Sequence, residues 1–223
     1  MYKRILFLLF LFPLISNAAG GIGLSATRVI FLASSDQNSI SVINQQDNKR
    51  YLINAWVENS DGKKTTDFVI TPPLFVSEPG TENSLRIYRN TSGFPKDRES
   101  LYWLNVKSIP AIDKKTLQNN NTLQLAVLTR EKIIVRPDSL NSEVKAALDK
   151  ISISRSGNRV NIKNGSPFYI AMVNIKVSGK ELPAQNIPPF GEVSLNSLNN
   201  SNKISYQTVN DYGALTPVVI KTY

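Results

Sequence analysis

Residues 51–63 read YLINAWVENSDGK, and this stretch indicates the class of fold. The run over residues 51–57 is rich in aromatic and β-branched residues, which is typical of a β-strand. The polar run behind it contains Asp61-Gly62, and an Asp-Gly pair between two strand-like runs predicts a hairpin turn. The stretch therefore favours antiparallel β-structure.

The same strand-like character recurs along the chain. Apolar residues alternate with other residues in Ser39–Val42 and in Leu123–Val127. Only Asn141–Lys150 has helical character, and it is short. Further predicted strands are Ala26–Phe31, Phe68–Ile70, Ser84–Tyr88, Leu101–Lys107, Lys132–Val135, Lys150–Ser154, Arg159–Lys163, Tyr169–Val177, Glu192–Leu195, Ile204–Val209 and Pro217–Lys221. Many short strands with turns about every ten residues predict an all-β protein built of β-sandwiches.

The first residues have the pattern of an export signal. Met1–Arg4 is a cationic start, Ile5–Ile15 is an apolar run, and Ser16-Asn17-Ala18 supplies small residues for cleavage after about Ala18. The apolar run is shorter than the roughly 20 residues that span a bilayer, so residues 1–18 are predicted to be a signal peptide. We expect an exported protein of the bacterial periplasm, without stable membrane insertion.

The remaining chain is long enough for two sandwiches of about 100 residues each. A boundary is predicted at Arg136-Pro137, since proline interrupts strand pairing and a polar segment follows. The predicted domains are residues 19–137 and residues 138–223.

The composition excludes several kinds of catalytic and metal site. The 223 residues include no cysteine and no histidine, which excludes a Ser-His-Asp triad, a cysteine nucleophile, a thiolate or imidazole zinc site and a disulfide. No acidic calcium loop and no glycine-rich phosphate loop is present. We expect no cofactor and no metal.

Two other functional patterns are weak. Ser60 and Lys63 fit the S-x-x-K pattern of a serine hydrolase, but that chemistry needs a desolvated lysine, and these residues lie in a predicted turn. The formal charge of +9 is spread over scattered basic residues, without the aromatic–basic cluster of a nucleic-acid-binding module. Nucleic acid is therefore not an expected partner.

Residues 121–137 read NTLQLAVLTREKIIVRP and carry an unusual combination. In an extended strand Leu123, Leu125 and Val127 project from one face, because strand side chains alternate. An ordinary core-facing strand has the same pattern. The cations that follow it, together with one near the start of the mature chain, set the segment apart: Arg130, Lys132, Arg136 and Arg28.

Six motifs in order resemble the periplasmic pilus chaperones of the chaperone–usher pathway. They are TRVIF (27–31), YLINAWVEN (51–59), TPPLFVSEPGTENSLRI (71–87), PKDRESLYWLNVKSIP (95–110), KIIVRP (132–137) and NDYG (210–213). The resemblance implies two immunoglobulin-like sandwiches in an L or boomerang arrangement, and it implies no catalytic activity. Its partners would be pilin subunits and an outer-membrane usher, and the free protein would be able to self-associate.

The resemblance also assigns roles to particular residues. It implies that Leu123, Leu125 and Val127 form a donor strand that completes the sandwich of a pilin subunit, with Asn121 at the end of this set. Arg28 and Lys132 would hold the subunit's terminal carboxylate. A charged trio would link the two domains: Glu99, Arg136 and Asp211.

The sequence departs from the family pattern in its second domain, and two alternative functions also fit the sequence. The second domain is loosely matched beyond SPFYI (166–170) and NDYG, and it lacks the cysteines of some members. The segment Lys107–Asn121 is short, which resembles the short-loop subclass. The alternatives are a secreted structural or adhesive β-sandwich protein, such as a pilin or adhesin, and a hydrolase built on Ser60 and Lys63.

Overall fold

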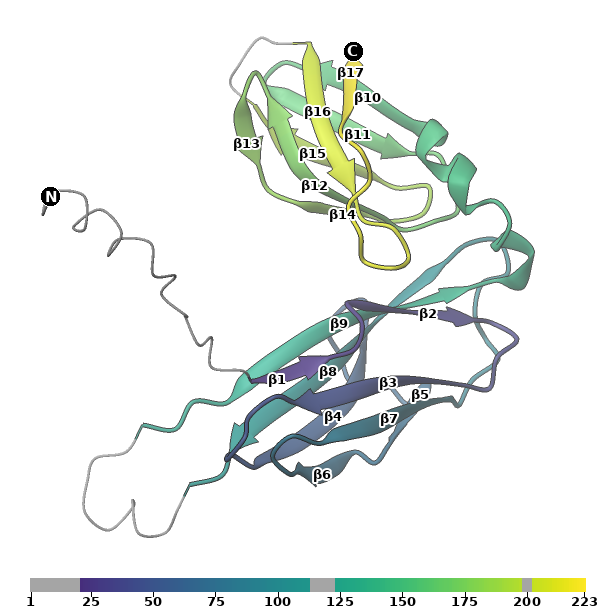
Figure 1. Cartoon of the computed structure of the whole chain (residues 1–223). Coiled ribbons are helices and arrows are strands. Elements are labelled where there is room, and N and C mark those ends of the chain that lie inside the picture. Colours follow the sequence, from purple (N-terminus) through teal and green to yellow (C-terminus); the bar gives the residue numbers. More distant parts are fainter. Residues whose placement is uncertain (1–20, 113–122, 198–201) are drawn as a thin grey trace, which may run out of the picture.

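The computed structural model describes residues 21–112, 123–197 and 202–223, which form two β-sandwiches set at an angle to each other (Figure 1). The predicted all-β class with two immunoglobulin-like sandwiches in an L-shaped arrangement is confirmed. The predicted signal peptide and Asn121 lie outside the described residues.

Domain 1 pairs a four-stranded sheet, β1-β3-β7-β5, with a five-stranded sheet, β2-β9-β8-β4-β6. Its core lies between the two sheets and includes Phe31, Ile53, Leu85 and Ile133, all fully buried. The strands are β1 (Ile22–Leu24), β2 (Arg28–Leu32), β3 (Gln37–Asn44), β4 (Tyr51–Asn59), β5 (Phe68–Thr71), β6 (Leu74–Ser77), β7 (Glu82–Arg89), β8 (Ser100–Pro110) and β9 (Val127–Arg136).

Domain 2 has a separate core between a three-stranded sheet, β10-β11-β15, and a five-stranded sheet. In the latter the order is β13-β12-β16-β17, and β14 also pairs with β12. The strands are β10 (Ile151–Ser156), β11 (Arg159–Asn164), β12 (Ile170–Val177), β13 (Lys180–Leu182), β14 (Gln185–Ile187), β15 (Glu192–Asn196), β16 (Lys203–Thr208) and β17 (Val219–Thr222).

The chain switches sheets between β1 and β2. β1 pairs with β3 in the four-stranded sheet, whereas β2 lies parallel to β9 in the five-stranded sheet, with Arg28 opposite Lys132. Alternation along β2 sends Val29 and Phe31 into the core and Arg28 and Ile30 to the other face. The switch therefore determines which part of β9 has a neighbour.

Two local predictions hold over a shorter range than expected, and one was wrong. The predicted Asp61-Gly62 turn forms, with Gly62 at a positive φ of 77°, and Glu58 pairs antiparallel with Lys64 across it. The next strand, β5, then pairs with β7 in the opposite sheet, so the hairpin extends no further. The segment Asn141–Lys150, predicted to have helical character, contains the 3-10 helix Val144–Lys150, and a second 3-10 helix, Asp138–Leu140, precedes it. Leu123–Ala126 lies outside any strand, because the pairing of β8 with β9 ends at Ser108 and Val127.

Candidate functional site

The first half of β9 has a free edge. β8 pairs with β9 from Val127 to Val135 on one side, while β2 pairs with it on the other side only from Lys132 to Arg136. Among the described strands, nothing pairs with that other side of residues 127–131. An unpaired edge presents backbone donors and acceptors that another strand can use.

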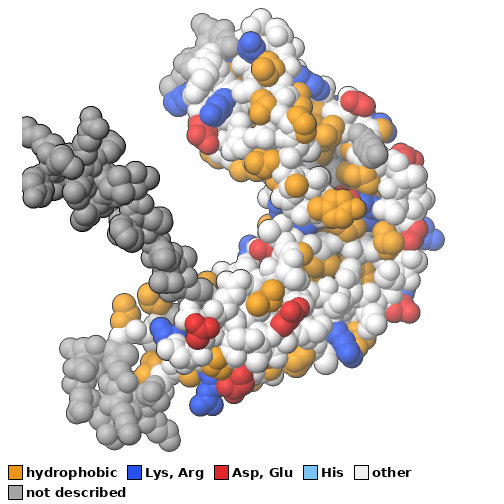
Figure 2. Space-filling view, in the orientation of Figure 1, with side chains coloured by type: hydrophobic (Ala, Val, Ile, Leu, Met, Phe, Trp, Pro, Cys, Tyr) orange, Lys and Arg blue, Asp and Glu red, His pale blue; other side chains and the backbone are white. Residues whose placement is uncertain are grey.

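Apolar side chains surround this edge. The exposed fractions are 82% for Leu123, 68% for Leu125 and 59% for Val127. Leu128, which the sequence reasoning did not single out, is 53% exposed. Figure 2 shows hydrophobic side chains on the surface at this end of domain 1. Contiguous exposed apolar side chains mark an interaction surface.

Arg28 and Lys132 lie side by side where the free edge ends, because they are partners in the parallel pairing of β2 with β9. Nη1 of Arg28 donates a hydrogen bond to the carbonyl of Val209 in domain 2, at 3.2 Å. Its Nε is buried and has no hydrogen-bond partner within the described chain. Nζ of Lys132 lies 6.0 Å from the centre of the Trp103 ring. Two half-buried cations thus lie next to each other at the end of the free edge.

Burial disfavours both charges. Desolvation lowers the pKa of Arg28, although Asp211, Glu131 and Glu99 act in the opposite direction. Desolvation also lowers the pKa of Lys132, the positive charge of Arg28 lowers it further, and Glu131 opposes both effects. A bound anion would favour the charged forms of both side chains and so offset the effect of burial. The pair is therefore suited to hold a carboxylate.

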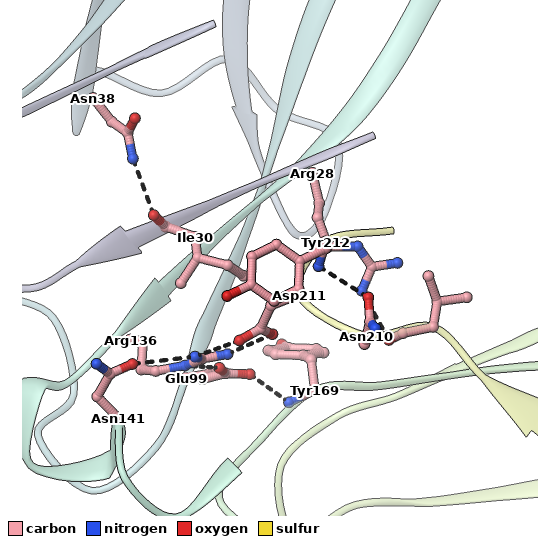
Figure 3. A network of polar contacts seen from close by, with 11 residues as sticks. Arg28, Ile30, Asn38, Glu99, Arg136, Asn141, Tyr169, Asn210, Asp211 and Tyr212 are labelled. Atoms are coloured by element: carbon pink, nitrogen blue, oxygen red, sulfur yellow. Dashed lines mark hydrogen bonds and ion pairs between the residues drawn. The ribbon is translucent and has the colours of Figure 1, made fainter. Parts of the chain in front are cut away.

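Glu99, Arg136 and Asp211 meet between the two domains (Figure 3). Nε of Arg136 donates to Glu99 at 2.7 Å, while Nη1 and Nη2 donate to the two carboxylate oxygens of Asp211 at 2.7 and 2.9 Å. The side chains of Arg136 and Glu99 are almost fully buried, and that of Asp211 is 30% exposed. Glu99 and Arg136 belong to domain 1, so the bidentate pair with Asp211 fastens domain 2 to it.

Further contacts place Glu99 at the same junction. Its Oε2 accepts a hydrogen bond from the backbone N–H of Tyr169 at 2.7 Å, and its own N–H donates to the carbonyl of Pro167 at 2.9 Å. Burial raises the pKa of Glu99 despite these bonds and Arg136. For Arg136 desolvation is the largest effect and lowers the pKa, but the carboxylates of Asp211 and Glu99 together raise it. Loss of Arg136 would therefore leave Glu99 buried without its cation.

A cleft of about 680 Å³ lies at this junction and is lined by both domains, including Arg28, Ile134, Tyr169 and Tyr212. Sequence reasoning missed Tyr212 and the Val209 carbonyl, since a contact between positions 28 and 209 has no local signal. It also missed Trp103, whose ring lies 4.4 Å from the guanidinium of Arg130. The sequence signal that could have pointed to Trp103 was its place within the PKDRESLYWLNVKSIP motif.

The Ser60–Lys63 pattern has no catalytic geometry. Both residues are exposed in the turn after β4, where the side chain of Asn59 accepts the N–H of Lys63 at 3.0 Å. In residues 21–112, 123–197 and 202–223 no group of acidic side chains could hold a metal ion. No helix in those ranges is long and apolar enough to cross a membrane.

Both domains match described families. Residues 21–141 match "Pili and flagellar-assembly chaperone, PapD N-terminal domain", and residues 146–219 match "Pili assembly chaperone PapD, C-terminal domain". The chain is 46% identical to "Probable fimbrial chaperone SfmC" of Escherichia coli K12, covering 98% of this chain and 97% of the relative. It is 44% identical to "Chaperone protein FimC" of the same strain, covering 90% and 84%.

Solved structures are similar over the same range. The crystal structure of the periplasmic chaperone SfaE superposes with a TM-score of 0.81 at 40% identity, covering 91% of this chain and all of that one. A Salmonella enterica SafA pilin in complex with the SafB chaperone gives a TM-score of 0.82 at 28% identity, covering 92% and 97%. The similarity therefore includes a chaperone seen together with a pilin.

Replacing Arg136 by alanine is expected to loosen the junction without unfolding either domain, because each domain has its own core. Removing one partner of a buried ion pair costs about 3–5 kcal/mol. Small-angle scattering should show a broader distance distribution than for the wild type, with faster proteolysis between the domains. Arg50→Ala, which removes an exposed pair with Glu78 inside domain 1, is the control. A scattering profile identical to that of the wild type would contradict the fastening role.

Lys132 is expected to titrate with a pKa below that of a lysine in an unfolded peptide, and Arg28→Gln should raise this pKa by removing a neighbouring charge. NMR of the ¹³C-methylated amine would measure both values. Since a carboxylate favours the charged amine, its binding should weaken as pH rises through this lowered pKa. If Lys132 had the pKa of an ordinary lysine, and if this pKa did not change in Arg28→Gln, the two cations would not be coupled.

Proposed function

The chain belongs to the pilus-assembly chaperone family, and we propose that it holds its subunits by the free edge of β9, with Arg28 and Lys132 as the anchor of the terminal carboxylate. The chaperone function itself follows from the relatives and domains. The alternative reading as a pilin or adhesin is not favoured. What the proposal adds is the assignment of residues.

One observation supports the proposal. The free edge, the exposed apolar side chains and the two cations all lie along β9 and the residues that lead into it, with Arg28 on the neighbouring strand. The free backbone of residues 127–131 directly follows the exposed Leu123 and Leu125, and it ends at Lys132 beside Arg28. A subunit strand can pair with the edge while the apolar side chains enter the subunit's open groove. The cations then meet the carboxylate at the end of that strand.

The geometry also sets the direction of the bound strand. β2 occupies the side of β9 from Lys132 onward, so an incoming strand can pair only with the residues before it. If its last carboxylate lies at Arg28 and Lys132, the strand runs from the start of β9 toward Lys132. It is then parallel to β9 and in line with β2, whose place in the sheet it continues.

The apolar contact supplies most of the binding free energy in this proposal. Burial of Leu123, Leu125 and Val127 would contribute roughly 5–8 kcal/mol before ordering costs. The carboxylate anchor sets the register, since a slip of one residue would turn the subunit's apolar side chains away from the groove. Donor strand and anchor thus have separate tasks.

Other parts of the proposal rest on the family. We place the signal peptide at residues 1–18, the domains at 19–137 and 138–223, and the protein in the periplasm, as the SfaE relative is described. It acts by binding, without catalysis or cofactor, and passes the subunit to an outer-membrane usher. The segment Lys107–Asn121 that suggests the short-loop subclass lies partly outside the described residues. The exposed apolar edge leaves the free protein able to self-associate.

The anchor is tested with a ten-residue peptide of alternating apolar and polar residues, made with a free carboxylate and with a terminal amide. The wild type should bind the carboxylate form about 30-fold more tightly, equivalent to about 2 kcal/mol. Arg28→Ala and Lys132→Ala should each reduce this ratio toward one, while Arg86→Ala, exposed on the opposite sheet, should not. Equal binding of both peptides by the wild type would refute the anchor.

The donor strand is tested by introducing a glutamate at one of three neighbouring positions in turn. Leu125→Glu should abolish capture of a coexpressed pilin subunit, because it places a carboxylate in an apolar groove. Gln124→Glu and Ala126→Glu add the same charge at exposed neighbouring positions on the opposite face of an extended strand and should be far milder. Gln124→Glu also removes a hydrogen bond to the carbonyl of Pro110, so Ala126→Glu is the cleaner control. Equal loss of co-purified subunit in all three would count against this docking mode.

A further inference from the structure

Tyr212 is the most exposed large hydrophobic side chain of the described residues, with 94% of it accessible. It lies on a tight turn that Asn210 organises. The Asn210 side-chain oxygen accepts the N–H groups of Tyr212 at 3.0 Å and of Ala214 at 2.9 Å. The ring is therefore presented to solvent by an ordered turn.

The turn is fastened to domain 1 on both sides of Tyr212. Asp211 forms the bidentate pair with Arg136, and Gly213 lies against Thr27. A Cβ on Gly213 would come within 2.3 Å of the Thr27 hydroxyl oxygen, and the positive φ of 82° also favours glycine. Thr27 immediately precedes Arg28. These contacts hold Tyr212 at a set position near the carboxylate anchor.

Tyr212 and Arg28 line the same cleft from opposite domains. Figure 3 shows Tyr212, Asp211 and Arg28 in the same region at the junction between the domains. The Arg28 guanidinium already contacts the turn through the Val209 carbonyl. One wall of the cleft thus offers positive charge, and the other offers an aromatic surface.

We propose that Tyr212 packs on the side chain of the last residue of a bound subunit strand and gives the chaperone a preference for a large apolar residue there. This inference rests on the proposed function, which places that residue's carboxylate at Arg28 and Lys132. The charge of the two cations selects a chain end with a free carboxylate as the occupant. An aromatic ring with few rotatable bonds adds apolar contact at low entropic cost.

The high exposure of the Tyr212 side chain argues against a role in stabilising the free protein. If the ring shielded the Arg136–Asp211 pair, it would itself be partly covered, whereas almost all of it faces solvent. Asp211 remains 30% exposed beside it. The free protein therefore gains little packing from this ring, which becomes useful when something covers it.

The test uses ten-residue peptides of alternating apolar and polar residues that end in glycine, alanine, leucine or phenylalanine, each as carboxylate and amide. The wild type should bind the leucine and phenylalanine carboxylates about tenfold more tightly than the glycine carboxylate. Tyr212→Ala should remove this preference but keep the preference for carboxylate over amide. Tyr212→Phe should behave as the wild type. Val218→Ala removes an exposed apolar side chain of domain 2 that does not line the cleft, and it should have no effect.

The outcomes separate the two proposals. Loss of the carboxylate preference in the wild type would overturn the anchor itself. A retained carboxylate preference with an unchanged side-chain preference in Tyr212→Ala would overturn the role of Tyr212 alone. Scattering from free Tyr212→Ala should match the wild type. A broader distance distribution would show that the ring stabilises the junction, and it would contradict the contact role.

Discussion

The parallel pairing of β2 with β9 begins at Arg28 and Lys132, and the proposed function depends on this starting point. Had β2 started a few residues earlier in the same sheet, it would have covered residues 127–131 of β9. Because the chain places β1 in the opposite sheet, that edge stays open. The same change of sheet sets Arg28 at the end of the edge. Sheet topology thus aligns backbone, apolar and charged features along one edge.

The second requirement is a fixed angle between the domains, since Arg28 of the proposed anchor contacts domain 2. Arg136 is the residue before Pro137, at the end of β9, and it joins Glu99 of domain 1 to Asp211 of domain 2. It lies four residues after Lys132 on the same strand, so the junction and the proposed anchor are neighbours on β9. The contact of Arg28 with the Val209 carbonyl adds a second tie. The proposed binding site and the domain junction therefore lie next to each other on β9.

The fold class could be predicted because strand alternation and turn residues are local signals, and the ordered motifs pointed to the charged positions. The structure brings Arg28 next to Lys132, and it brings Glu99, Arg136 and Asp211 together. The hairpin after β4 is limited to the pairing of Glu58 with Lys64, because an Asp-Gly turn specifies a reversal and not the sheet that the next strand joins. Leu123–Ala126 was wrongly expected to be a strand, since alternation does not show whether a partner strand is available. Tyr212 was missed because its significance arises only from Thr27 and Arg136, far away in sequence.

The central claim is that the free edge of β9 is where a subunit strand binds. Backbone hydrogen exchange of the chaperone, alone and in complex with a pilin subunit, tests it most directly. The account predicts that those amides of residues 127–131 that point to the free edge, away from β8, exchange rapidly in the free protein and become protected in the complex. Amides of residues 133–135, which lie between β2 and β8, should be protected in both states. Unchanged exchange at residues 127–131 in a complex that protects another strand would contradict the account.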